Sequence, residues 1–227
     1  GLSAETPRGF LFNAYDPMGV LAGGPVTTVE NFVASYSGAA FVQGIASELW
    51  FATLTDAARP GEPLPPAMPH RDLRVVRTNL SGQAMGAQLS ADNAQRCPPS
   101  FDGGTPGAYA LPEVWEDPKV VRLPNGLFAA WMERWSPGCN VSAQPMVKIR
   151  GVWLNDDLSV RVAPFDLTDQ FNELPSQFAV INDGPLVDVA ATSQTRFVPP
   201  RANGEQRVLC RAYVDGQMTT TAPTIVA

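Results

Sequence analysis

Prolines and glycines constrain this chain more than any other feature of its sequence. Its 227 residues include 22 prolines and 19 glycines, spread so evenly that few windows longer than about 12 residues lack both. A proline inside a helix removes a hydrogen bond and clashes with the preceding turn. The best helical window, 39–58, contains Phe51-Ala-Thr-Leu-Thr, which suits a strand equally well. We therefore expect an all-β protein.

Turn sequences between apolar runs predict antiparallel hairpins. Asn125-Gly126, Asp183-Gly184 and Asp215-Gly216 each separate two such runs, and Asn155-Asp156-Asp157 separates another two. Asn-Gly and Asp-Gly reach the positive φ angles of a type I′ turn at little cost, which makes them strong hairpin markers. We expect a hairpin at each of the four places.

The turns also recur at a regular distance. Asn125 and Asp183 lie 58 positions apart, and Asp156 and Asp215 lie 59 apart. Each span contains two hairpin turns, so one unit has four strands. Units of about 40 to 60 residues with four strands are typical of propeller blades. We expect propeller-like blades of antiparallel hairpin repeats, with a pair of β-sandwiches as the alternative.

One stretch resembles a known kind of repeat. Residues 118–131, Pro-Lys-Val-Val-Arg-Leu-Pro-Asn-Gly-Leu-Phe-Ala-Ala-Trp, place an Asn-Gly turn before an aromatic strand. This pattern resembles the repeats of secreted bacterial propeller-like and adhesin modules, over residues 118–227. The chain lacks the Ser-x-Asp-x-Gly-x-x-Trp boxes of sialidase-like propellers. The resemblance implies bladed architecture and an exported protein.

The chain divides into an arm and one domain. Residues 1–24 form an expected N-terminal arm, in which a strand-like segment is flanked by prolines and a glycine pair. That strand either closes the last sheet of its own domain or adds to the sheet of a neighbouring copy. In the second case the assembly residues are Phe10, Leu11, Phe12 and Tyr15. We expect 25–227 to be a single all-β domain of tandem four-stranded units, clearest at 118–175 and 176–227.

Charge and motifs argue against several classes of function. There are 16 basic and 22 acidic residues, a net charge of −6, and basic residues do not cluster with aromatic ones. We therefore expect no nucleic-acid partner. No apolar run approaches the roughly 18 residues of a spanning helix, so we expect no membrane insertion. His70 is the single histidine, and phosphate-binding glycine loops are missing. We expect no metal and no cofactor.

Paired carboxylates remain as a route to catalysis, because a glycosidase needs only two acids about 5 to 10 Å apart. Asp188 interrupts an apolar strand, sharing a face with Leu186 and Ala190, and Glu133 ends another strand beside Arg134. An acid in such a position is usually paired with an arginine or protects a sheet edge. We assign no catalytic residue.

Aromatic side chains are the best candidates for ligand binding. Exposed indoles stack on sugar rings or anchor protein interfaces. The ligand-binding candidates are Trp131, Trp135, Trp153 and Tyr213. The alternative is that they fill the space between packed sheets. Trp131 and Phe128 point to opposite faces of their strand, so a sheet with one buried face cannot bury both.

Cys97 and Cys139 both lie in Pro/Gly loops, and Cys210 lies in an apolar strand. We expect a Cys97–Cys139 disulfide with Cys210 as a buried thiol, or else three free thiols in a reducing compartment. The preferred function is a non-catalytic interaction module that binds a glycan or a protein and is secreted or displayed on a cell or virion surface. The alternative is a self-assembling structural subunit of a fibre, surface layer or virion, which binds copies of itself. The third is a glycoside-active enzyme with paired carboxylates.

Overall fold

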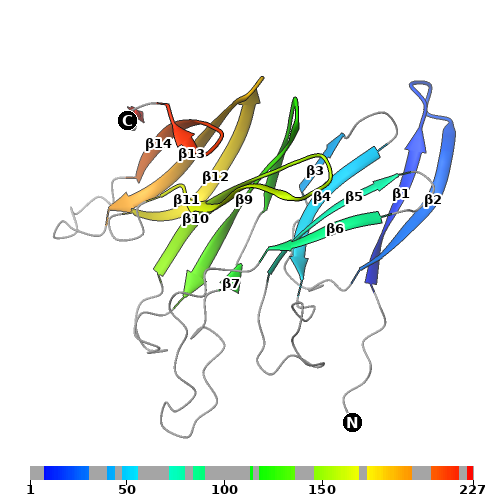
Figure 1. The fold of residues 1–227 in the computed structure, drawn as a ribbon, viewed down its shortest axis with the longest axis horizontal. Coiled ribbons are helices and arrows are strands. Elements are labelled where there is room, and N and C mark those ends of the chain that lie inside the picture. Colours follow the sequence, from blue (N-terminus) through cyan, green and yellow to red (C-terminus); the bar gives the residue numbers. More distant parts are fainter. Residues whose placement is uncertain are drawn as a thin grey trace, which may run out of the picture.

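A computed structural model describes residues 8–30, 40–43, 48–55, 72–79, 84–89, 113–114, 118–135, 146–168, 173–195, 206–219 and 224–226. Every regular element in these ranges is a β-strand, and every strand pair is antiparallel (Figure 1). The all-β prediction is confirmed. In these ranges no helix could cross a membrane.

The strands form four sheets. The first is the hairpin of β1 (Arg8–Tyr15) and β2 (Leu21–Glu30). The second contains, in spatial order, β3 (Ala40–Gln43), β4 (Glu48–Thr55), β5 (Asp72–Asn79) and β6 (Ala84–Leu89). The third contains β7 (Glu113–Val114), β8 (Lys119–Leu123), β9 (Gly126–Trp135), β10 (Met146–Leu154) and β11 (Val160–Asp166). The fourth contains β12 (Glu173–Asp183), β13 (Leu186–Thr195), β14 (Gln206–Val214), β15 (Gln217–Met218) and β16 (Thr224–Val226).

The three larger sheets are built from strands that pair with their neighbours in the chain, as the hairpin repeats predict. β8 and β7 both pair with one side of β9, whose other side pairs with β10 and then β11. In the last sheet β13 lies between β12 and β14. β12 begins at Glu173, so this strand crosses the predicted boundary between 175 and 176, and the division into units stays a prediction.

The larger sheets stack face to face in a row (Figure 1). One apolar core joins the β3–β6 and β7–β11 sheets and contains Trp50, Leu73 and Trp131. A second core joins the β7–β11 and β12–β16 sheets and contains Phe128 and Val187. The middle sheet is therefore buried on both faces, which is why Trp131 and Phe128 are both core residues although they point in opposite directions. The described sheets do not close into a ring.

All four expected hairpins form, but only one has the expected type I′ turn. Asp215 and Gly216 both have positive φ, at 47° and 79°, between the paired residues Val214 and Gln217. A type I′ turn requires positive φ at both central positions, and Asp-Gly provides this. The local sequence decides the turn type here.

Prolines prevent a type I′ turn in the two hairpins that contain Pro124 and Pro185. The pair Leu123–Gly126 encloses Pro124 and Asn125, and the positive φ of 148° falls on Gly126. In the next hairpin Gly184, with a φ of 59°, precedes Pro185 at the centre. A proline ring holds φ near −65°, so neither central pair can have two positive values. The second turn has the φ signs of type II′.

The N-terminal segment is half of a hairpin and not an isolated strand. β1 pairs with β2 along its length, from the Arg8–Glu30 pair to the Tyr15–Leu21 pair. β2 continues through residue 24, where we expected the arm to end. The register shifts on both sides of Ala14, which pairs with Gly23, so the expected flexible glycine pair is accommodated inside a strand by an irregular register.

Candidate functional site

The described aromatic candidates lie in the two cores. Trp131 and Trp153 are fully buried, and Tyr213 is nearly so. Trp153 stacks on Phe165, with ring centroids 5.3 Å apart, and the Tyr213 hydroxyl donates to the carbonyl of Leu167 at 3.3 Å. These rings fill the space between sheets. Their ligand-binding role stays a prediction, and their burial does not favour it.

Several candidates lie outside the described part of the chain. These are Cys97, Cys139, His70 and the side chains of Trp135, Phe10, Leu11 and Phe12. The disulfide therefore stays a prediction. Cys210 is described, and its thiol is free and half-buried between two strands of the last sheet, so it is less buried than expected.

Glu133 belongs to a buried ladder of charges across β9, β10 and β11. Its side chain has no solvent exposure, and its Oε1 accepts from Trp131 Nε1 at 3.0 Å. Lys148 Nζ lies 3.9 Å from Oε2, and Arg150 Nη1 lies 3.2 Å from Oε1. Both bases also contact Asp166 Oδ1, at 3.2 Å each. Two acids and two bases thus balance their charges within one sheet.

This arrangement gives Glu133 a structural role. A buried carboxylate is stable only with ion-pair and hydrogen-bond partners, and Glu133 has both. Its carboxylate is neutralised by two bases and is closed off from solvent. The pairing with a basic residue that is usual for an acid in an apolar strand is what the structure shows.

Asp188 lies on a different layer from Glu133. Its neighbours Val187 and Val189 point into the second core, so Asp188 points away from it and is exposed. Glu133 lies on the other face of the middle sheet, next to Trp131 of the first core. Stacked sheets are about 10 Å apart, so the second core separates these acids by more than the roughly 10 Å that glycosidases allow. The two carboxylates do not form a catalytic pair.

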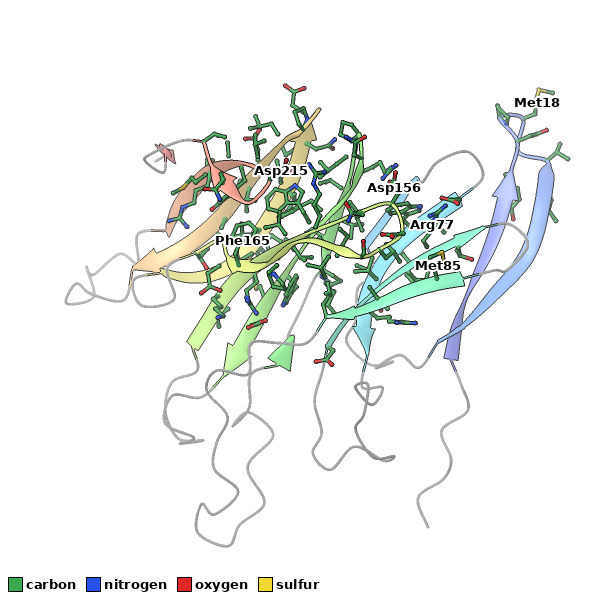
Figure 2. All side chains as sticks on the ribbon, viewed as in Figure 1. Met18, Arg77, Met85, Asp156, Phe165 and Asp215 are labelled. Carbon is green, nitrogen blue, oxygen red and sulfur yellow. The ribbon has the colours of Figure 1, made fainter. Side chains whose placement is uncertain are left out.

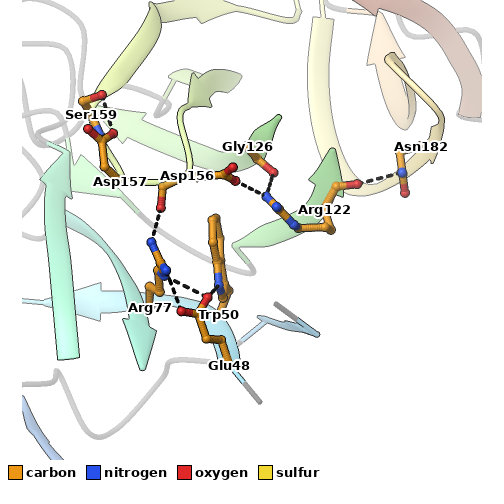
Figure 3. Close-up of polar contacts among 9 residues, drawn as sticks. All are labelled: Glu48, Trp50, Arg77, Arg122, Gly126, Asp156, Asp157, Ser159 and Asn182. Atoms are coloured by element: carbon orange, nitrogen blue, oxygen red, sulfur yellow. Dashed lines mark hydrogen bonds and ion pairs between the residues drawn. The ribbon is translucent and has the colours of Figure 1, made fainter. Parts of the chain in front are cut away.

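A second charge network joins the sheets at one end (Figure 3). Arg77 on β5 donates to both Glu48 oxygens, at 2.8 Å from Nε and 2.5 Å from Nη2. Its Nη1 donates to the carbonyl of Asp156 at 2.7 Å, and Arg122 on β8 donates to the Asp156 carboxylate at 2.7 Å. The buried Trp50 ring lies 4.5 Å from the Arg122 guanidinium and 5.6 Å from that of Arg77. The network ties the β3–β6 sheet to the middle sheet.

The loop that carries Asp156 is held in place by a strained leucine. Leu158 has a φ of 64°, and its buried side chain belongs to the first core. Positive φ costs a leucine about 1 to 2 kcal/mol, which burial of its side chain offsets. The anchored loop places Asp156 between the two arginines. Asn182 on β12 donates to the Arg122 carbonyl at 2.8 Å, which extends the network to the last sheet.

This network predicts a pH dependence of stability. The hydrogen bond from Arg77 holds the pKa of Glu48 below its usual range; partial burial opposes this, and the Trp50 hydrogen bond adds to it. A lowered folded-state pKa stabilises the protein above the unfolded value of about 4.3, and this contribution is lost as the pH falls through the folded value. In thermal unfolding followed by circular dichroism, Glu48→Gln should melt below the wild type at pH 7. The difference should shrink below about pH 4. A difference that stays constant down to pH 2 contradicts this assignment.

Four large exposed apolar side chains, including the most exposed one in the described ranges, lie at the turn between β1 and β2. We call residues 15–21 the hairpin tip. Met18 is 87% exposed and Tyr15 is 61% exposed, and Val20 and Leu21 are also more than half exposed. Figure 2 shows Met18 projecting from the end of the hairpin, away from the other sheets. Half of the exposed large apolar side chains in the described ranges thus belong to this one turn.

The backbone N–H groups of the hairpin tip form hydrogen bonds within the tip itself. The Asp16 N–H donates to the Val20 carbonyl at 2.8 Å, and the Gly19 N–H donates to the Asp16 carbonyl at 2.9 Å. Asp16 Oδ1 accepts from the N–H groups of Met18 and Val20, both at 2.9 Å. Pro17 has no N–H. Since burying an unpaired polar group is costly, a turn with its donors satisfied can enter an apolar contact cheaply.

Sequence reasoning missed the hairpin tip and the charge network for different reasons. The turn signals Pro17 and Gly19 lie between apolar segments, and this pattern could have predicted a hairpin with an apolar end. No local pattern connects Glu48, Arg77 and Asp156, because Glu48 and Arg77 meet only when β4 pairs with β5 and Asp156 reaches them only when two sheets stack.

Comparison with known proteins identifies no family. No protein-family model and no curated protein matches the chain. One similar solved structure is an α-L-arabinofuranosidase from Lactobacillus brevis, at 10% identity and a TM-score of 0.40, covering 89% of this chain and 60% of that one. Another is an α-L-arabinofuranosidase (CtGH43) from Clostridium thermocellum ATCC 27405, at 11% identity and a TM-score of 0.27, covering 86% of this chain and 74% of that one. Likeness at this level assigns neither a family nor an activity.

Proposed function

We propose that this protein is a non-catalytic interaction module that binds another protein through the hairpin tip. The observation that carries the proposal is the exposure of Met18, Tyr15, Val20 and Leu21 on one projecting turn whose backbone donors are internally satisfied. Exposed apolar groups gathered in this way mark interaction sites more often than scattered ones do.

The chemistry of the tip favours a protein over a glycan. A methionine adapts its shape to an apolar surface, and a tyrosine adds contact area with one polar group. Sugar rings stack best on exposed indoles, and the tryptophans whose side chains the structure describes, Trp50, Trp131 and Trp153, are all buried. The position of Asp188 and Glu133 on different layers supports a non-catalytic role over paired-acid hydrolysis.

We also propose that the sheets are propeller-like blades. Face-to-face stacking of antiparallel sheets with neighbouring strands in chain order supports propeller-like blades, since a sandwich pair leaves no sheet buried on both faces. We propose an exported or particle-surface location, which the expected Cys97–Cys139 disulfide would accompany.

Site-specific photo-crosslinking tests the proposed function. With benzoylphenylalanine in place of Met18, the full chain in the cells that make it should give a discrete protein adduct on irradiation. The matched control is the same probe in place of Met85, which is exposed on β6 outside the tip. Adducts from neither position, or equal adducts from both, contradict the proposal. Turnover of chromogenic glycosides by the purified chain contradicts its non-catalytic part.

A further inference from the structure

We infer that the protein partner is a second copy of this chain, which receives the hairpin tip on the outer face of its β12–β16 sheet. This inference rests on the function proposed above. The outer face is the surface of that sheet that points away from the middle sheet.

Two neighbouring rows of side chains cross β12, β13 and β14 in the middle of the outer face. In one row Ile181, Asp188 and Ala212 are direct cross-strand neighbours; Ile181 is 64% exposed and Asp188 is exposed, whereas Ala212 is buried. In the other row Ala179 pairs with Ala190, which pairs with Cys210. Alanine and cysteine side chains are short, so the surface along this second row is lower than at Ile181. Because β13 is paired on both sides, its backbone needs no further partner there.

Sheets of this chain are covered by packing one apolar face on another, and the outer face is a mainly apolar face of the same kind. Each internal core is the apolar face of one sheet placed on the face of the next. Both faces of the middle sheet are covered in this way, and the outer face of the β12–β16 sheet is the next face in that row. An apolar occupant there extends the same kind of contact.

The two surfaces complement each other in shape and hydrogen bonding. Met18 projects from the tip, and the exposed Ala179 beside Ile181 offers a short side chain against which it can pack. Asp188 has no hydrogen-bond or ion-pair partner among the residues that the structure describes, and it lies within a mainly apolar surface. Tyr15 carries an exposed phenol, which can donate to a carboxylate. We assign Tyr15 as the donor to Asp188 of the second copy.

The contact must join two chains. The β1–β2 hairpin and the β12–β16 sheet lie at opposite ends of the row, with two sheets between them (Figure 1). A tip therefore cannot reach the outer face of its own chain. Because each copy supplies one tip and one outer face, the contact is head-to-tail, and it generates rings or filaments instead of a closed two-fold dimer.

Sedimentation velocity over a range of concentrations tests the inference. The wild-type chain should assemble as concentration rises. Met18→Lys and Ile181→Lys should each weaken association by roughly tenfold or more, as expected for a charge introduced into an apolar contact. Met85→Lys, outside both surfaces, should behave as the wild type. Circular dichroism should show that all variants are folded. The Ile181→Lys variant should tolerate its new charge because position 181 lies opposite Asp188 on the neighbouring strand.

Mixing the two impaired variants gives the sharpest result. The Met18→Lys chain retains an intact outer face, and the Ile181→Lys chain retains an intact tip, so an equimolar mixture should form heterodimers that cannot extend. The two altered surfaces carry like charges and cannot rescue each other. Tyr15→Phe should weaken the self-association of the otherwise wild-type chain. The same substitution should weaken self-association less when the chain already carries Asp188→Asn.

Three outcomes overturn the inference. They are a wild-type chain that stays monomeric at all concentrations, variants that assemble as the wild type does, and a mixture that does not pair. In that case the photo-crosslinked adducts at position 18 distinguish failure of the self-association inference from failure of the proposed function. A different protein leaves the proposed function standing, whereas lipid alone or no adduct overturns both.

Discussion

Replacing Glu133 with alanine should lower the free energy of unfolding by about 3 to 5 kcal/mol, as is typical when one partner of a buried ion pair is removed. The change leaves Lys148 and Arg150 without the buried one of their two shared carboxylates, in a region where both side chains are nearly excluded from water. It also removes the acceptor of the Trp131 indole N–H. Urea unfolding followed by tryptophan fluorescence measures the loss.

Two controls isolate the effect of burial. Asp166→Ala removes the other acid of the ladder, whose side chain is 39% exposed, and water can replace part of what it provides. Its cost should be clearly smaller. Asp188→Asn, on the exposed outer face, should change stability by no more than about 0.5 kcal/mol. Since salt screens exposed charges more than buried ones, 0.5 M NaCl should not rescue Glu133→Ala. A loss below about 1 kcal/mol contradicts the ladder.

Trp153→Ala should cost about 3 to 5 kcal/mol, the range for removing a large aromatic side chain from a core. Trp153 is fully buried between the middle and last sheets, with Phe128 at 4.5 Å and Phe165 at 5.3 Å between ring centroids. Gly151, two residues earlier on the same strand, has no side chain, and Phe128 and Leu167 occupy the space over it, so the surrounding core is already tightly packed. Thermal and urea unfolding should both show the loss.

A matched pair of substitutions separates packing from hydrogen bonding. The indole N–H of Trp153 is buried and has no hydrogen-bond partner among the described residues, whereas that of Trp131 donates to Glu133. Trp131→Phe should therefore cost more than Trp153→Phe, by about 1 to 3 kcal/mol for a lost bond to a charged group. Equal costs for the two variants contradict this account of the Trp131 indole.

Local sequence preferences predict the strands and the places where they reverse. Positive φ is inexpensive for Asp-Gly, so Asp215-Gly216 forms its type I′ turn from local sterics alone. The same local rule, applied to a neighbouring proline, explains the different turns around Pro124 and Pro185. These preferences act over about four residues, and the hairpin repeat adds them in order along the chain.

Packing between sheets sets which faces are buried and which charges meet. Alternation shows that Trp131 and Phe128 point in opposite directions, but only stacked neighbours on both sides of the middle sheet make both of them core residues. The same stacking makes Glu133 a buried structural acid and leaves Met18 at an exposed tip. Burial depends on surfaces contributed by residues far apart in the chain, and a local pattern carries no information about which sheet will cover a given face.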